Sequence, residues 1–185
     1  MRVVRAADAV AMPWRNGGGV TREYLVQPSD EGYDWRLSVA EVATNGPFSE
    51  FAGFDRILVL LSGAGMVLRF ADAPDVTLSE PLQHHRFAGE AAVNAALVSG
   101  PTTDLNLFWR RGAWDADMQV VEAPCDVWND GVPGRGVCLT YVVEGEVSVD
   151  GTQLRRGDLV QCDHPFRLMG RGRAVVFSLT TAACR

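Results

Sequence analysis

Short runs of alternating apolar and polar residues dominate this chain, and turn-forming residues separate them. In residues 35–42, large apolar side chains alternate with smaller or polar ones, so that Arg36 and Ser38 share one face of the expected strand. The chain shows no long helical periodicity with capping residues, so these runs predict an all-β protein, built as a sandwich or a barrel. The expected strands are residues 20–26, 35–42, 57–61, 66–70, 91–97, 104–110, 138–143 and 174–180.

The pattern of the first half of the chain recurs in the second half. Residues 60–67 and 142–149 both place a glycine-containing turn between apolar runs, and residues 87–90 and 156–158 both contain a Gly-Glu or Gly-Asp turn. This order of strands and turns is typical of a cupin half-barrel, and two copies predict a bicupin with two cupin-like β-barrel or jelly-roll lobes in one chain. We expect an N-terminal lobe, residues 1–112, with the candidate ligand pocket, and a C-terminal lobe, residues 113–185.

Three consecutive glycines, Gly17 to Gly19, lie in the stretch that we expect to shape a site. Ordering glycine is entropically costly, so a chain accepts it where the backbone needs a positive φ or a close approach. The glycines are flanked by Trp14, Asn16 and Thr21, and such a mixture of apolar surface and placed polar groups suits a small-molecule site. The alternative is a tight surface turn between two strands, with Asn16-Gly17 as the turn.

Polar residues also share faces on the expected strands of the first lobe. If these faces line the lumen of the lobe, either Arg36 or Arg56 is expected to hold a ligand carboxylate in bidentate fashion. The alternative is that each polar residue faces solvent on the outside of the sheet. The candidate ligand-binding residues are Trp14, Asn16, Gly17, Gly18, Thr21, Glu23, Arg36, Ser38, Arg56, Asp104 and Asn106.

Histidine and cysteine positions argue against a metal site. The chain has three histidines and no His-x-His motif, and the adjacent His84 and His85 are expected to lie in a solvated turn before Phe87. Its four cysteines form no Cys-x-x-Cys pair, so we expect reduced thiols that pack as small apolar groups. We therefore expect no metal and no other cofactor.

Composition and charge narrow the class of protein. Apolar residues make up 47% of the 185 residues and charged residues 22%, which is the balance of an ordinary globular domain. The formal net charge of −6 disfavours nucleic acid and anionic membranes as partners. The chain begins with no signal-peptide pattern, and its longest apolar run, residues 57–68, is too short to span a bilayer. We therefore expect a cytoplasmic protein.

Five blocks of the sequence, in a fixed order, carry a family resemblance: residues 12–23 (MPWRNGGGVTRE), 35–42 (WRLSVAEV), 46–56 (GPFSEFAGFDR), 87–90 (FAGE) and 100–107 (GPTTDLNL). Together they resemble the HutD/Ves family. Two positions depart from the family pattern, Ala52 where Pro is usual and Glu90 where Asp is common. The resemblance implies a bicupin fold, often dimeric, without the metal ligands of other cupins. It also implies a regulatory role in histidine utilisation and a small acidic ligand such as urocanate or formylglutamate.

Three functions fit these observations, and we favour the first. It is a non-catalytic protein that binds a small carboxylate and modulates histidine utilisation, with no catalytic residue and with a homodimer left open. The second is a metal-independent isomerase, lyase or hydrolase acting on an amido-acid, with Glu23, Asp104 or Glu41 as general base. The third is an interaction module.

The interaction module would present aromatic faces to a partner or to a second copy of the chain, because aromatic residues are enriched in protein interfaces. Its integrity would depend on Trp109, Trp114 or Trp128.

Overall fold

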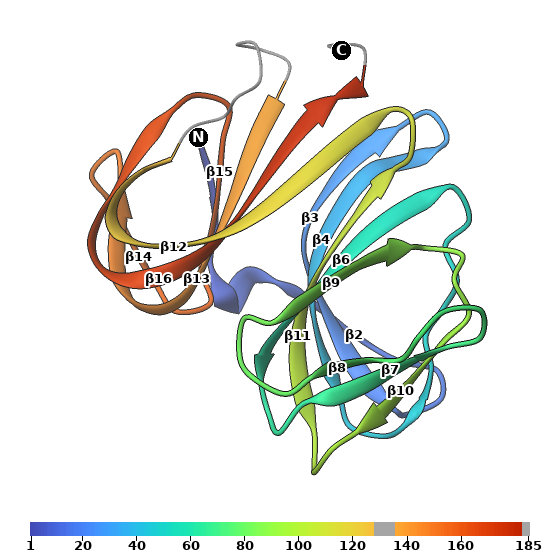
Figure 1. Ribbon diagram of the computed structural model, residues 1–185. Coiled ribbons are helices and arrows are strands. Elements are labelled where there is room, and N and C mark those ends of the chain that lie inside the picture. Colours follow the sequence, from blue (N-terminus) through green and yellow to red (C-terminus); the bar gives the residue numbers. More distant parts are fainter. Residues whose placement is uncertain (128–135, 183–185) are drawn as a thin grey trace. The chain divides into compact units, whose positions relative to one another are not determined.

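The structure is a computed structural model, and it describes residues 1–127 and 136–182. The described residues form an all-β protein (Figure 1) with one short 3-10 turn, η1 (Ala6–Asp8). The strands are β1 (Arg2–Val4), β2 (Val10–Pro13), β3 (Gly19–Ser29), β4 (Gly32–Val42), β5 (Gly46–Pro47), β6 (Phe54–Ser62), β7 (Met66–Phe70), β8 (Val76–Leu78), β9 (His84–Ala88), β10 (Val93–Leu97), β11 (Thr102–Arg110), β12 (Trp114–Val127), β13 (Gly136–Val149), β14 (Thr152–Arg155), β15 (Leu159–Cys162) and β16 (Phe166–Thr181).

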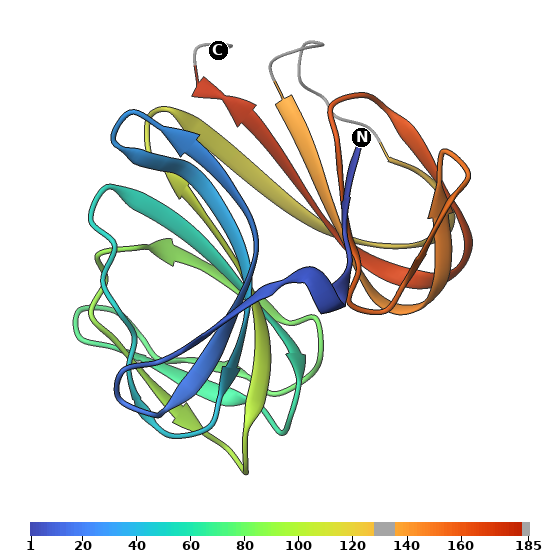
Figure 2. The ribbon, with the colours of Figure 1, turned by 180° about the vertical axis from the view of Figure 1, so that it is seen from behind.

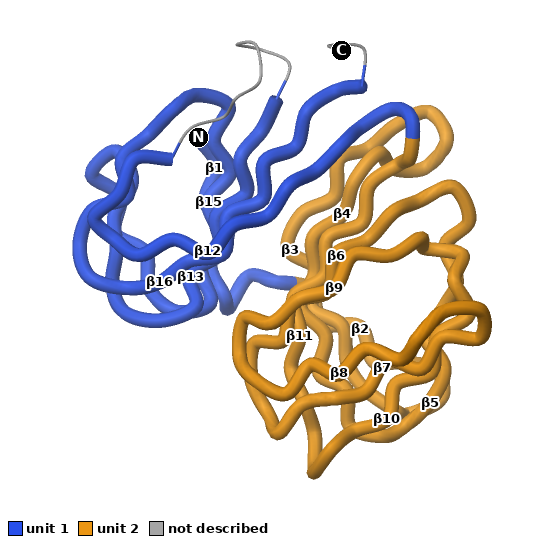
Figure 3. The backbone as a smooth tube through the Cα atoms, viewed as in Figure 1, with its two compact units in different colours: residues 1–9, 112–185 blue, residues 10–111 orange. Residues whose placement is uncertain are grey.

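The chain divides into two compact units, which Figure 3 shows in different colours. The N-terminal unit is residues 10–111, and the C-terminal unit is residues 1–9 together with residues 112–185. The structure assigns residues 1–9 to the C-terminal unit, whereas the sequence-based boundary placed residues 1–112 together in the N-terminal lobe. They belong to the C-terminal unit because β1 pairs with β15, with Arg2 opposite Gln161 and Val4 opposite Leu159.

The N-terminal unit consists of two antiparallel sheets. The large sheet has the strand order β2-β3-β4-β11-β6-β9, and the small sheet has the order β5-β10-β7-β8. Figure 2 shows β2 and β3 side by side at one edge of the large sheet. A cluster of buried residues joins the two sheets, with Leu58 and Leu60 from β6, Met66 and Leu68 from β7, and Val93 from β10. Both sheets keep two edge strands, so they are not the closed barrels that the sequence allowed.

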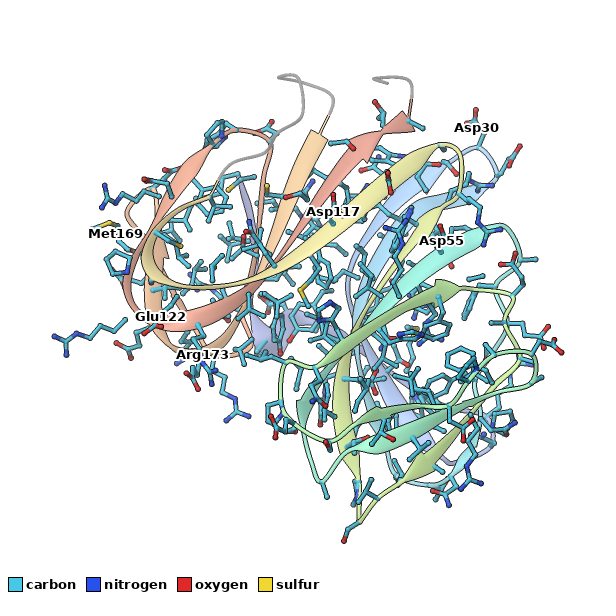
Figure 4. All side chains as sticks on the ribbon, in the orientation of Figure 1. Asp30, Asp55, Asp117, Glu122, Met169 and Arg173 are labelled. Carbon is cyan, nitrogen blue, oxygen red and sulfur yellow. The ribbon has the colours of Figure 1, made fainter. Side chains whose placement is uncertain are left out.

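The C-terminal unit contains one sheet with the order β1-β15-β13-β16-β12, and β14 pairs with β13. Its three long strands, β12, β13 and β16, carry an apolar core that includes Val142, Leu168 and Val176. Met169 and Arg173 project outward from β16 (Figure 4), and the Arg173 guanidinium pairs with the Glu144 carboxylate at 2.5 Å.

Several elements differ from the sequence prediction. Residues 114–127, where the sequence predicted no strand, form β12, and residues 166–181 form one continuous strand, β16. The segment expected as strand, glycine turn and strand at residues 142–149 lies within one strand, β13, whose register shifts between Val142 and Glu144. His84 and His85 lie on β9, paired with β6, and not in a turn. The sequence at residues 128–136 (WNDGVPGRG) is rich in turn-forming residues and predicts a loop, but residues 128–135 lie outside the described residues.

The described residues contain no helix with the length and apolarity needed to cross a bilayer.

The buried carboxylate of Asp158 fixes the segment that follows β1. It accepts hydrogen bonds from the Arg5 guanidinium at 2.8 Å, the Ala6 backbone N–H at 3.1 Å and the Arg155 backbone N–H at 3.1 Å. Burial alone would raise the pKa of this carboxyl, but the three hydrogen bonds outweigh burial and lower it. Asp158 therefore links the N-terminal segment to the turn between β14 and β15.

We expect Asp158→Ala to cost about 1–3 kcal/mol of unfolding free energy, because it leaves two backbone N–H groups without their acceptor. Hydrogen exchange should then accelerate at residues 2–4 more than in the rest of the sheet. Asp117→Ala, at an exposed position on β12, is the control and should leave both quantities unchanged. Unchanged exchange at residues 2–4 in the Asp158 variant would contradict this role.

Candidate functional site

A cavity of about 820 Å³ lies within the N-terminal unit. Its volume is in the range of small-molecule sites, which are typically about 300–1,000 Å³. The large sheet supplies the floor through β3, β4, β6 and β11, and the rim comes from the β2–β3 connection and from β5 and the loop after it. The lining residues are Met12, Pro13, Trp14, Arg15, Asn16, Thr21, Arg36, Ser38, Ala40, Val42, Pro47, Phe48, Ser49, Phe51, Arg56, Asp104, Asn106 and Phe108.

The register of three adjacent strands brings the polar floor together. β11 lies between β4 and β6, and Phe108 is opposite both Arg36 on β4 and Arg56 on β6. Asn106 is opposite Ser38 on β4. Because side chains two residues apart on a strand share a face, Asp104 lies on this face as well.

Arg56 is a buried cation enclosed by aromatic rings. The side chain is 5% exposed, and its guanidinium carbon lies 5.0 Å from the ring centre of Phe48, 4.7 Å from Phe87 and 4.6 Å from Phe108. One terminal N–H donates to Asn106 Oδ1. Burial lowers the pKa of Arg56 to about 10, with nearby Arg36 adding to the effect and Asp104 opposing it. The guanidinium is therefore charged at neutral pH.

Asp104 is the acid at the bottom of the same cavity. It is 1% exposed, its Oδ1 accepts a hydrogen bond from Asn106 Nδ2, and its Oδ2 has no hydrogen-bond partner. Burial raises the pKa of Asp104 to about 7, against the opposing effects of the Asn106 hydrogen bond and the Arg56 charge. Arg56, Asn106 and Asp104 thus form a buried chain in which an amide separates the cation from an acid that titrates near neutral pH.

Arg36 occupies the half-buried side of the floor. Its Nε lies 3.0 Å from Glu23 Oε2, an ion pair by distance in which the Nε hydrogen is not well aligned for a hydrogen bond. Glu23 itself does not line the cavity. The ion pair fixes the base of the Arg36 side chain, which lines the cavity.

The glycines shape the rim through the backbone. Gly17 adopts a φ of +70°, and its N–H donates to the Trp14 carbonyl at 3.0 Å. At Gly19, an added Cβ would lie 2.3 Å from the Glu41 carbonyl oxygen and 3.1 Å from the Trp14 ring. The Trp14 ring can therefore lie against Gly19, and its Nε1–H donates to Thr21 Oγ1 at 2.8 Å.

The cavity gathers eight of the eleven residues predicted from sequence: Trp14, Asn16, Thr21, Arg36, Ser38, Arg56, Asp104 and Asn106. It does not include Glu23, Gly17 or Gly18. The Gly17 and Gly18 N–H groups donate within the loop, the latter to Asn16 Oδ1 at 3.0 Å, so these glycines serve the backbone of the rim.

Sequence reasoning missed most of the aromatic lining. Phe108 shares the face of Asp104 and Asn106, so the same alternation contained the signal for it. Phe48 and Phe51 lie in the segment after the short strand β5, where no alternation marks an inward direction. Arg15 was passed over within the glycine stretch itself.

The histidines lie elsewhere. His85 packs against the rings of Phe70 and Phe87, at 5.5 and 5.8 Å between ring centres. Burial, followed by the charge of His84, lowers the pKa of His85. His164, in the C-terminal unit, contacts Asp150 and Asp163 at 3.0 Å each. In the described part of the chain, no three His, Cys, Asp or Glu side chains are grouped so that they hold a metal ion.

One family model and two relatives each match most of this chain. The family model described as HutD matches residues 6–177. A 21.2 kDa uncharacterized protein in the hutC 3′ region of Pseudomonas putida is 34% identical over 171 residues, covering 88% of this chain and 85% of that relative. The protein Ves of Citrobacter koseri is 33% identical over 174 residues, covering 91% and 87%.

Solved structures agree with these relatives. HutD of Pseudomonas fluorescens SBW25 superposes with a TM-score of 0.87 at 35% identity, covering 97% of this chain and 98% of that one. A cupin 2 conserved barrel domain protein from Leptotrichia buccalis superposes with a TM-score of 0.60 at 10% identity, covering 97% and 96%. The second likeness concerns the fold alone and makes the fold cupin-like.

We expect Gly19→Ala to cost about 2 kcal/mol or more of unfolding free energy, because the new Cβ would overlap the Glu41 carbonyl. Gly46→Ala is the matched control, since an added Cβ there meets nothing within 4 Å, and it should change stability by less than about 0.5 kcal/mol. Denaturant unfolding measures both. Equal stabilities would show that the rim does not depend on this close approach.

We expect Asp104→Asn to flatten the pH dependence of stability. The folded-state pKa of Asp104, about 7, lies above the ordinary aspartate value, so its contribution to stability is complete at low pH and is lost as pH rises toward 7. Relative to the wild type, the unfolding free energy of the variant should therefore rise by roughly 1 kcal/mol per pH unit between pH 5 and pH 7. Denaturant unfolding across this range measures the difference, and parallel curves would show that Asp104 is ionised throughout.

Proposed function

Because this chain belongs to the HutD/Ves family, we propose that the cavity of its N-terminal unit binds a small carboxylate without catalysis. The observation that carries the proposal is the buried guanidinium of Arg56 at the cavity floor, held by Asn106 and by three aromatic rings. A fixed guanidinium is the group that proteins use most for planar recognition of a carboxylate.

The charge of the lining supports an anionic ligand. Arg15, Arg36 and Arg56 line the cavity, and Asp104 is its one acidic lining residue. Since the pKa of Asp104 is raised to about 7, the acid offsets these cations only in part at neutral pH. The cavity therefore favours an anion.

The apolar part of the lining limits the ligand's shape. Trp14, Phe48, Phe51 and Phe108 supply aromatic surface around the polar floor. A ligand with one carboxylate at the floor and a short unsaturated or amide body, such as urocanate or formylglutamate, suits this division.

We also propose a regulatory role in histidine utilisation. The support is the Pseudomonas putida relative in the hutC 3′ region and membership of the HutD family. In this role, the occupancy of the cavity reports the level of a pathway acid.

The two units correspond, in this proposal, to the two cupin-like lobes of a bicupin. Each is an antiparallel unit with its own apolar core, and the ligand cavity belongs to the N-terminal one.

One observation favours an alternative, a metal-independent enzyme acting on an amido-acid. The raised pKa of Asp104, about 7, is in the range that suits a general acid or base. An isomerase, lyase or hydrolase would use such a group, and measurement of turnover separates it from a binding protein.

We expect urocanate, formylglutamate, or both to raise the thermal stability of the purified protein and to bind saturably in calorimetry, because a ligand of the native state stabilises it by mass action. Histidine, formiminoglutamate and glutamate complete the panel. Arg36→Gln and Arg56→Gln should weaken binding about tenfold or more, which corresponds to about 1.4 kcal/mol. Ser38→Ala tests the floor without removing a charge.

Arg22→Gln is the matched control, an exposed arginine on β3 outside the cavity lining, and it should bind as the wild type does. Proton NMR of each ligand during incubation reports turnover. Binding with an unchanged ligand supports the proposal, and product formation supports the enzyme instead. Failure of every acid to bind up to millimolar concentration would refute the carboxylate site.

A further inference from the structure

The ionisable groups around Asp104 form a small and definable set. On β6 the group is Arg56, on β4 it is Arg36, and at the rim it is Arg15; Asn106 is the polar neighbour on β11 itself. Glu23 acts on this set from outside the cavity through its ion pair with Arg36. Asp104 is thus the one acid that lines the cavity, and Arg56 is its closest cation through Asn106.

A bound ligand would place a second carboxylate beside the same guanidinium. Two carboxylates that share one cation in a buried site repel each other, and the repulsion favours protonation of one of them. The ligand carboxylate stays ionised because it pairs directly with the Arg56 guanidinium and has the ordinary acidity of a free carboxylate. Asp104 is the carboxylate that has to be protonated, because its ionised form is buried and one of its oxygens accepts no hydrogen bond.

The unpartnered oxygen of Asp104 identifies where the proton would reside. Its Oδ1 accepts from Asn106, whereas Oδ2 is buried and accepts from no side chain or backbone group. A proton on Oδ2 therefore breaks no existing hydrogen bond. It removes a buried negative charge that only Arg56, through Asn106, compensates.

We propose that the cavity takes up its carboxylate ligand together with one proton, and that Asp104 accepts this proton at Oδ2. The proposal rests on the proposed function, since it concerns the same cavity and ligand. The proton comes from the solvent, the ligand stays ionised, and Arg56 passes from pairing with Asp104 through Asn106 to pairing with the ligand. Asp104 is in this way a specificity residue that favours a singly charged group at the floor.

The direction of the pH effect follows from the state of the empty cavity. The pKa of Asp104, raised by burial to about 7, means that the acid is half ionised at neutral pH and ionised at pH 8. Ligand binding must then draw a proton from the solvent onto Asp104, so affinity falls as pH rises. One proton of linkage makes the affinity about tenfold weaker at pH 8 than at pH 6.

Calorimetry with N-formylglutamate tests the proposal, because its carboxylates stay ionised over this range. Titrations at pH 6, 7 and 8 in PIPES and in Tris, whose ionisation enthalpies differ, give the number of protons taken up. We expect nearly one proton at pH 8, close to none at pH 6, and the tenfold change in affinity. Asp104→Asn should bind with the same affinity at all three pH values and take up no proton.

Asp72→Asn is the control, an exposed acid in a loop of the same unit, and it should retain the wild-type proton uptake. Binding by the wild type that neither changes with pH nor takes up a proton would overturn this inference and leave the proposed function intact. Proton uptake that persists in Asp104→Asn would also overturn it, because another group would then be responsible.

Failure of N-formylglutamate to bind at any pH, while another acid of the panel binds, transfers the same titrations to that acid. Failure of the whole panel would overturn both proposals. If Asp104→Asn does not fold, a wild-type proton uptake near zero at pH 8 still overturns the inference.

Discussion

The buried guanidinium of Arg56 is the constraint on which the N-terminal unit depends. Moving a cation out of water costs several kcal/mol, so it persists only where hydrogen bonds and other charges compensate it. Here Asn106 accepts a hydrogen bond, and the rings of Phe48, Phe87 and Phe108 present their faces. These groups come from the β5 region, from β9 and from β11, so the cation is compensated only when the surrounding strands are assembled. The guanidinium charge that would attract an anionic ligand is therefore stable inside the protein only when these strands are folded together.

The rim of the cavity is made in a different way, by backbone geometry. The Trp14 ring reaches its position because Gly19 has no Cβ, and its indole N–H is then satisfied by Thr21. The floor and the rim of the cavity are thus positioned by different structural features. The sheet register places the polar groups, and the glycine-rich connection places an aromatic ring over their edge.

Much of the fold and of the cavity floor was predictable from sequence, because alternation within a strand does not depend on distant contacts. It predicted β4 and β11 and placed Arg36, Ser38, Asp104 and Asn106 on shared faces. The sequence pattern did not predict β12, because residues 114–127 mix charged with apolar residues and contain a proline, Pro124, at a register shift. Residues 60–67 and 142–149 look alike in sequence, yet one turns between two sheets and the other continues along β13, since partner strands decide the outcome. The aromatic enclosure of Arg56 and the unpartnered oxygen of Asp104 arise from residues far apart in the chain, which no local pattern reveals.

The pairing of β1 with β15 has a consequence for the protein during its synthesis. Val4 pairs with Leu159, so β1 leaves the ribosome about 155 residues before its partner strand exists. At translation rates of about 5–20 residues per second, this interval is roughly 8–30 s. Residues 10–111 can complete both of their sheets within that time, because all their strand partners lie between β2 and β11. The nascent chain can therefore contain one folded unit while β1 still has no partner strand, so the C-terminal unit can be completed only late in synthesis.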